Sequence, residues 1–156
     1  MRRKDREVTD ESRIDGIIRR CSCCRLGFSD GGEVYIVPMN FGFVKRDGKR
    51  VFYFHSAKEG RKVELLKNGC DVGFEMDCGY ELHPGEVPCD CYAEFSSIIG
   101  TGRAEIVTGE DEKILGLQSL MKQAAGKENC EFRPEMLAAV CVFRLEIDKL
   151  SCIVHL

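Results

Sequence analysis

The chain has 156 residues, of which 44% are hydrophobic and 31% are charged, so its composition excludes a disordered or fibrous protein and predicts one globular domain over 1–156. Its net charge of −3 argues against nucleic acid as the main partner, because phosphate binding usually accompanies a basic excess. No apolar run approaches the ~18 to 20 residues that span a bilayer, and the start, MRRKDREVTDESR, lacks the apolar core of a signal peptide. We therefore expect a cytoplasmic protein that does not bind membranes.

The first half of the chain predicts a helix followed by hairpins. Ile14, Ile17 and Ile18 recur at helical spacing over 10–20, with Thr9 or Asp10 available as the N-cap. Next come two β-rich stretches, each interrupted by a turn sequence, Asp-Gly-Gly at 30–32 and Arg-Asp-Gly-Lys at 46–49. We expect two consecutive hairpins that form a meander.

The middle of the chain predicts a short helix, a strand and a loop. Ser56 to Glu59 reads S-x-x-E, the form of a capping box, which predicts a helix that starts at Ser56 and stops near Gly69. Apolar residues alternate with others over 72–76, which predicts a strand. The segment 77–91 contains two glycines and two prolines and is expected to be a long loop.

The last third predicts a long strand over 92–107, an amphipathic helix over 114–124 that ends near Gly126, and strands over 143–148 and 151–155. About six antiparallel strands with a few peripheral helices indicate a mainly β, α+β protein. We expect a six-stranded antiparallel split β-barrel.

Ten cysteines are unusual for a chain of this length. Without an export signal we expect them to be mostly reduced and structural. Cys21 and Cys24 form one C-x-x-C pair, but no second pair follows, and the Cys89/Cys91 spacing is too tight for a zinc ribbon. A zinc site built on Cys21 and Cys24 and a redox-active pair are the two alternatives. We predict no metal site.

The segment from Tyr53 to Lys62 is the most informative part of the sequence. It predicts a strand that leads into a helix whose first turns carry Ser56, Arg61 and Lys62. Free backbone donors and cationic side chains at a helix start suit a phosphate group. The alternative is that Ser56 only caps the helix and that both cations are solvated.

Three segments resemble the 5-nitroimidazole-resistance branch of the pyridoxamine 5′-phosphate oxidase-like superfamily, and they occur in the order found in that family. They are FYFHSAKEGRK at 52–62, YIVPMNF at 35–41 and YAEFSSIIGTGRAE at 92–105. Together the resemblance spans most of the chain. It implies an FMN-binding split barrel that forms a homodimer.

The resemblance also implies which residues hold FMN. Ser56, Arg61 and Lys62 would hold the phosphate, and Ser97 would contribute from a strand that crosses the dimer interface. The isoalloxazine ring and ribityl chain would lie against two further groups, Pro38, Met39, Asn40 and Phe41 along one strand and Tyr53, Phe54 and His55 along another.

The function implied by the resemblance is reduction of a small electrophile, such as a 5-nitroimidazole, by an FMN-dependent oxidoreductase. His55 is the expected catalytic residue, because imidazole can donate a proton near neutral pH. A histidine that only hydrogen-bonds the backbone at the end of a strand is the alternative. Members of the superfamily also bind deazaflavin or haem, so a non-enzymatic flavin or haem binding or sensing protein remains the second hypothesis.

Overall fold

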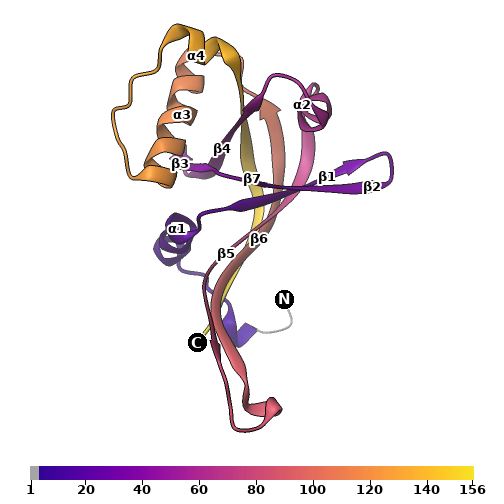
Figure 1. The fold of residues 1–156 in the computed structure, drawn as a ribbon, viewed down its shortest axis with the longest axis vertical. Helices are drawn as coiled ribbons and strands as arrows, with labels where there is room; N and C mark the ends of the chain where they lie inside the picture. The colour runs from indigo at the N-terminus through magenta and orange to yellow at the C-terminus, as the bar shows by residue number, and fades with distance from the viewer. Residues whose placement is uncertain (1–3) are drawn as a thin grey trace.

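The computed structural model describes residues 4–156 and consists of one antiparallel sheet with four α-helices around it (Figure 1). The seven strands, one more than the six expected, follow the order β2-β1-β5-β6-β7-β4-β3 in the sheet. Their bounds are β1 Cys24–Asp30, β2 Glu33–Met39, β3 Gly42–Arg46, β4 Lys49–Ala57, β5 Cys70–His83, β6 Tyr92–Ile106 and β7 Val140–His155. The expectation of a mainly β, α+β fold is confirmed.

Two tight turns form where the sequence predicts them. The turn between β1 and β2 lies at Gly31 and Gly32, and the turn between β3 and β4 lies at Asp47 and Gly48. All four residues have positive φ, the backbone form that matches the twist of a two-residue hairpin. The prediction of a meander is wrong, however, because the two hairpins lie at opposite edges of the sheet. The two hairpins are separated because β1 pairs with β5 and β4 pairs with β7. No local sequence pattern predicts such long-range pairing.

Two helices form close to their predicted limits. Helix α1 spans Glu11–Arg20, and Asp10 caps it by accepting a hydrogen bond from the backbone N–H of Arg13. Its buried face includes the three isoleucines that set the predicted period. Helix α3 spans Glu110–Ala125 and ends at Gly126, which has left-handed backbone geometry.

The predicted capping box is wrong. Ser56 lies in β4, because the β4–β7 ladder continues to Ala57, which pairs with Val140. Helix α2 spans only Arg61–Leu66 and begins after Gly60, whose φ of 127° favours glycine. Ser56 donates its hydroxyl hydrogen bond to the carbonyl of Ala57 and caps nothing.

The predicted loop over 77–91 is also wrong over much of its length. Strand β5 runs to His83, and it pairs with β6 again after an irregularity between Cys78 and Glu81. Gly79, at φ 68°, lies inside this irregularity, so the glycine marks a β-bulge there. The two strands form an arm that projects from the molecule (Figure 1), with the 3-10 helix η2, Pro88–Asp90, near its tip.

The core lies inside the curved sheet. Phe52 is its centre, with edge-to-face contacts to Phe43 and Phe74 and a tilted contact to Phe41. Helices α3 and α4, Pro134–Ala139, cover the end of the sheet that carries β3 and β4 (Figure 1). The remaining short element is the 3-10 helix η1, Lys4–Arg6.

Candidate functional site

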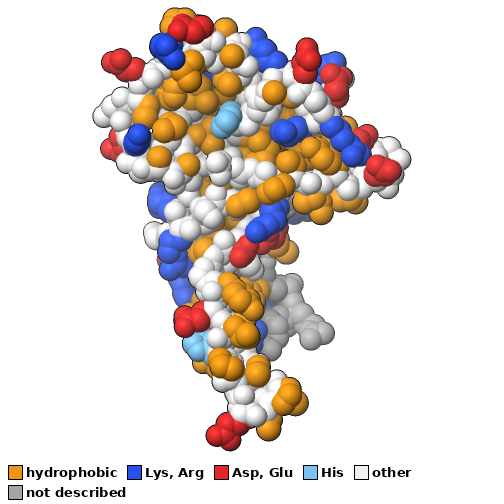
Figure 2. All heavy atoms as spheres, in the orientation of Figure 1, with side chains coloured by type: hydrophobic (Ala, Val, Ile, Leu, Met, Phe, Trp, Pro, Cys, Tyr) orange, Lys and Arg blue, Asp and Glu red, His pale blue; other side chains and the backbone are white. Residues whose placement is uncertain are grey.

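An apolar cavity of about 260 Å³ lies between β4 and the helices α3 and α4. Asn40 and His55 are the polar residues that line it, and both belong to the set predicted from the sequence. The other lining residues are apolar: Leu117, Leu120, Met121, Ala124, Phe132, Met136, Leu137 and Val140. Figure 2 shows hydrophobic side chains gathered over α3 and α4 on this part of the surface. A cavity of this kind suits a small, largely apolar ligand that is oriented by a few polar groups.

His55 lies near the end of β4, opposite Val142 of β7. Its neighbour Phe54 points into the core and stacks on Phe143, so strand alternation turns His55 outward. The His55 side chain is exposed and lines the cavity. An imidazole in this position can contact a ligand in the cavity and exchange protons with water.

Two glycines bring α3 close to the sheet. A Cβ on Gly42 of β3 would lie 2.0 Å from Ser119 Oγ and 2.5 Å from the backbone nitrogen of Leu120. A Cβ on Gly116 would lie 2.8 Å from the Tyr53 ring. The absence of both side chains therefore sets the depth at which α3 packs, and with it the wall formed by Leu117, Leu120 and Met121.

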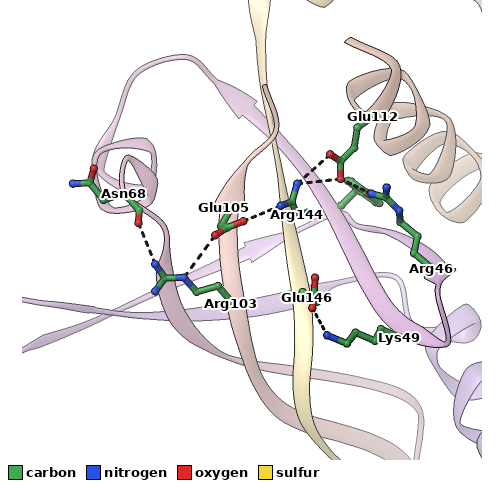
Figure 3. A network of polar contacts seen from close by, with 9 residues as sticks. Arg46, Lys49, Asn68, Arg103, Glu105, Glu112, Arg144 and Glu146 are labelled. Carbon is green, nitrogen blue, oxygen red and sulfur yellow. Dashed lines mark hydrogen bonds and ion pairs between the residues drawn. The ribbon is translucent and has the colours of Figure 1, made fainter. Parts of the chain in front are cut away.

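A polar network fixes the first turn of α3 (Figure 3). Glu112 forms ion pairs with Arg46 at 2.6 Å and with Arg144 at 3.0 Å, and it accepts a hydrogen bond from the Tyr53 hydroxyl at 2.9 Å. Burial raises the pKa of Tyr53 most, and the hydrogen bond to Glu112 adds to the increase, so the phenol stays protonated. Arg144 extends the network to Glu105 of β6 at 2.8 Å.

Helix α4 forms the outer wall of the cavity and was not predicted from the sequence. The sequence feature that indicates this helix is Pro134, which lies at the first helical position. The short apolar runs around Pro134 make this feature hard to recognise. Lys113 of α3 holds the end of α4 in place, because its ammonium donates to the carbonyl oxygens of Leu137 and Val140. Phe132, Met136 and Leu137 therefore line the cavity without having been predicted from the sequence.

The three residues predicted to hold a phosphate lie at and after the end of β4. Arg61 is exposed and pairs with Asp30 at 2.7 Å and with Glu33 at 3.1 Å, and its guanidinium lies over the Tyr35 ring. Within residues 4–156, Lys62 forms no ion pair and is half-buried in the first turn of α2. Ser56 is half-buried, with its hydroxyl on the Ala57 carbonyl.

Three of the predicted ring contacts are core residues in the structure. The Tyr53 and Phe54 side chains are fully buried and Phe41 is 1% exposed. Their side chains are therefore not accessible to a ligand, and the Tyr53 backbone lies between two strand partners, Gly42 of β3 and Arg144 of β7. The sequence pattern did not distinguish these roles, because an aromatic side chain suits a core and a ring-stacking site equally well.

The remaining predicted residues lie elsewhere. Pro38 is exposed on β2 and Met39 is half-buried against the core. Ser97 pairs with Ile153, which lies eleven positions beyond Val142, the partner of His55, along β7. That is roughly 35 Å of strand, so one small ligand cannot contact Ser97 and His55 of the same chain.

The Cys21/Cys24 pair lies in the core. Both residues are at most 2% exposed, and burial is the largest cause of the raised pKa of each thiol, which disfavours the thiolate that a metal or a redox reaction needs. Cys89 and Cys91 are exposed near the tip of the arm. In the described chain, all ten cysteines are free thiols.

The sheet order, the hairpins at its two edges and the helical cover define a split β-barrel of the pyridoxamine 5′-phosphate oxidase-like type. The model of the pyridoxamine 5′-phosphate oxidase family matches residues 10–154, and the chain belongs to this family. Flavin binding is typical of the family. No curated protein matches the sequence.

Several solved structures share the fold. A proposed 5-nitroimidazole antibiotic resistance protein from Bacteroides thetaiotaomicron is 28% identical, with a TM-score of 0.79 over 95% of this chain and 86% of that one. The flavocytochrome Anf3 from Azotobacter vinelandii is 21% identical, with a TM-score of 0.79 over 100% of this chain and 72% of that one. An FAD-binding protein from Mesorhizobium loti is 18% identical, with a TM-score of 0.65 over 97% and 98% of the two chains. The predicted resemblance is therefore confirmed at the level of family and fold.

None of the helices in residues 4–156 is long and apolar enough to cross a membrane.

Proposed function

We propose that this protein binds FMN and catalyses the reduction of a small electrophile, with a nitroaromatic such as a 5-nitroimidazole as the substrate class. The observation that carries the proposal is the apolar cavity that brings Asn40 and His55 together beside the end of β4. The same strand leads directly to the cations of α2. The flat ring of FMN would lie against the apolar cavity, and the phosphate at the other end of FMN would lie against these cations.

The phosphate would be held by Lys62, Arg61 and Ser56. Lys62 is free of ion pairs within the described chain, so it supplies a positive charge without losing a partner. Arg61 would exchange Asp30 and Glu33 for the phosphate, and both of those pairs are exposed and weak. The Ser56 hydroxyl would turn from the Ala57 carbonyl toward a phosphate oxygen.

Bound FMN would carry the electrons of the reaction. His55 would donate a proton to the substrate oxygen, since reduction of a nitro group consumes protons as well as electrons. Asn40 would orient the same substrate through its amide, and the apolar wall from α3 and α4 would exclude water from it.

A homodimer is part of the proposal. On the outer face of the sheet Ile36 is 63% exposed and Ile99 is 56% exposed, and the positions between them include Gly27, Gly73 and the Arg25–Glu75 ion pair. Large exposed apolar side chains on one sheet face favour an interface. Ser97 lies on the same face as Ile99, two residues along β6, so a second copy would bring it to a site that its own chain does not reach.

We expect sedimentation analysis to give twice the chain mass of 17.6 kDa. The variant Ile36→Glu/Ile99→Glu should be monomeric, because it would bury four unpaired carboxylates per dimer. Leu115→Glu is the matched control, since Leu115 is 39% exposed on α3, and it should stay dimeric. A parent protein that sediments as a monomer at micromolar concentration would refute the dimer.

The function is tested by the absorption spectrum and by turnover. We expect the purified protein to take up FMN and to show flavin bands, and the dithionite-reduced holoprotein to reduce a 5-nitroimidazole under anaerobic conditions. A Soret band would identify a haem protein instead, and bound FMN without turnover would identify a flavin carrier or sensor.

His55→Ala is expected to retain FMN and the dimer but to lower the rate of nitro reduction by about 100-fold, the usual contribution of a general acid. His155→Ala is a matched control on β7, and it should keep the parent rate. Stopped-flow measurement of substrate reduction by each reduced holoprotein compares them. An unchanged rate in His55→Ala would remove His55 from the mechanism.

A further inference from the structure

The distal arm formed by β5 and β6 carries a group of three polar residues away from the cavity. Pairing between β6 and β7 begins at Phe95, so the residues nearer the tip form a ribbon of two strands. On this ribbon Glu81 lies directly opposite Glu94, and His83 lies opposite Tyr92. Because side chains alternate along a strand, Glu81, His83 and Glu94 share one face.

The three side chains are close enough to bind one ion. One carboxylate oxygen of Glu81, one of Glu94 and a ring nitrogen of His83 lie within 4.8 Å of one another. Ligands about 2.1 Å from a tetrahedral zinc ion are roughly 3.4 Å apart, so small side-chain rotations would close the group around a metal. His83 Nε2 and Glu94 Oε1 are already 3.4 Å apart.

The Nε2 nitrogen of His83 is available to bind a metal ion. Nε2 is buried from solvent and has no hydrogen-bond partner among the described residues, because its contact with Glu94 is not aligned as a hydrogen bond. Tyr92 stacks on the imidazole with a centroid distance of 4.7 Å and an angle of 13° between the rings, which holds the ring plane in one orientation. A buried nitrogen held toward two carboxylates has the arrangement of a metal ligand.

The two carboxylates also have no lysine or arginine partner among the described residues. Across residues 4–156, neither Glu81 nor Glu94 forms an ion pair with a lysine or arginine. Like charges directly opposite each other weaken a strand pair, and an isolated two-stranded ribbon is only marginally stable in water. A divalent cation would remove the repulsion and would connect the two strands.

We propose that Glu81, His83 and Glu94 form a binding site for a divalent transition-metal ion that stabilises the arm. One imidazole and two carboxylates suit ions of the Mn²⁺ to Zn²⁺ series, and the absence of thiolate ligands argues against Cu(I). Three protein ligands leave further positions for water. The site contains no residue of the proposed flavin site, and it departs from the expectation that the chain binds no metal.

Mn²⁺ is the probe, because it is a hard ion that avoids the ten cysteines. Titration of the full-length protein followed by electron paramagnetic resonance of free Mn²⁺ should give one bound ion per chain. Amide signals in an isotope-labelled sample at a small Mn²⁺ fraction should broaden most strongly at 81–83 and 93–94 and less with distance along the arm. Absence of saturable binding, or strongest broadening elsewhere on the chain, would overturn the proposal.

Matched variants separate ligand loss from unfolding. Glu81→Gln/Glu94→Gln keeps the shape of both side chains and removes their repulsion, so the arm should stay folded while Mn²⁺ affinity falls by at least about 100-fold. His83→Ala should weaken binding by a similar factor, and Glu86→Gln, near the tip and outside the group, should bind like the parent. Parent affinity in either ligand variant would contradict the assignment.

Discussion

Lys62→Glu is expected to weaken FMN binding by at least about 100-fold, which corresponds to about 3 kcal/mol of binding free energy. The substitution replaces a half-buried cation that has no ion pair in the described chain with an anion that would face the phosphate. Fluorescence titration of the apoprotein with FMN measures the loss. The reversal of charge leaves the apolar cavity unchanged, so the affinity for the ring system itself should persist.

Riboflavin and Lys67→Glu provide the controls. The parent should prefer FMN over riboflavin, and Lys62→Glu should lose this preference, because only FMN carries the phosphate. Lys67 lies at the other end of α2, in an exposed ion pair with Glu64, so its reversal changes net charge equally but should preserve the preference. An unchanged ratio of the two affinities in Lys62→Glu would remove Lys62 from the phosphate site.

Gly42→Ala is expected to lower the free energy of unfolding by at least about 3 kcal/mol. The added methyl group would lie 2.5 Å from the backbone nitrogen of Leu120, and a backbone atom cannot move aside as a flexible side chain can. Helix α3 would have to shift away from β3, which would also open the cavity wall. Urea denaturation of the two proteins gives the difference.

Gly16→Ala is the matched control. Gly16 is exposed in the middle of α1, and a Cβ there meets no atom within 4 Å. The same change of side chain should therefore stabilise the protein, by about 1 kcal/mol, through helix propensity. If Gly42→Ala unfolds at the same urea concentration as the parent, close packing at Gly42 does not hold α3 in place.

The two predicted effects concern different parts of the same site. Lys62 would act through charge on one end of the ligand, whereas Gly42 acts through the position of the wall that contains Leu120 and Met121. The first substitution should change affinity without changing stability. The second should lower both, which distinguishes a ligand contact from a residue that only shapes the cavity.

The sequence by itself determined several local features and the family. The isoleucine spacing of α1, the positive-φ turns at 31–32 and 47–48 and the end of α3 at Gly126 depend on nearest neighbours, and all form as predicted. It also indicated His55 and Asn40 as ligand contacts on two different segments, and the structure brings both to one cavity.

Only the tertiary structure decided which residues are free to act. The β4–β7 ladder keeps Ser56 in a strand, the packing of α3 buries Tyr53, and pairing in the arm turns a predicted loop into the ribbon that holds Glu81 opposite Glu94. These outcomes depend on contacts between residues far apart in the chain, so secondary-structure propensity and residue spacing do not predict them. The position of Ser97, roughly 35 Å of strand from His55, has the same origin, because strand register alone sets that separation.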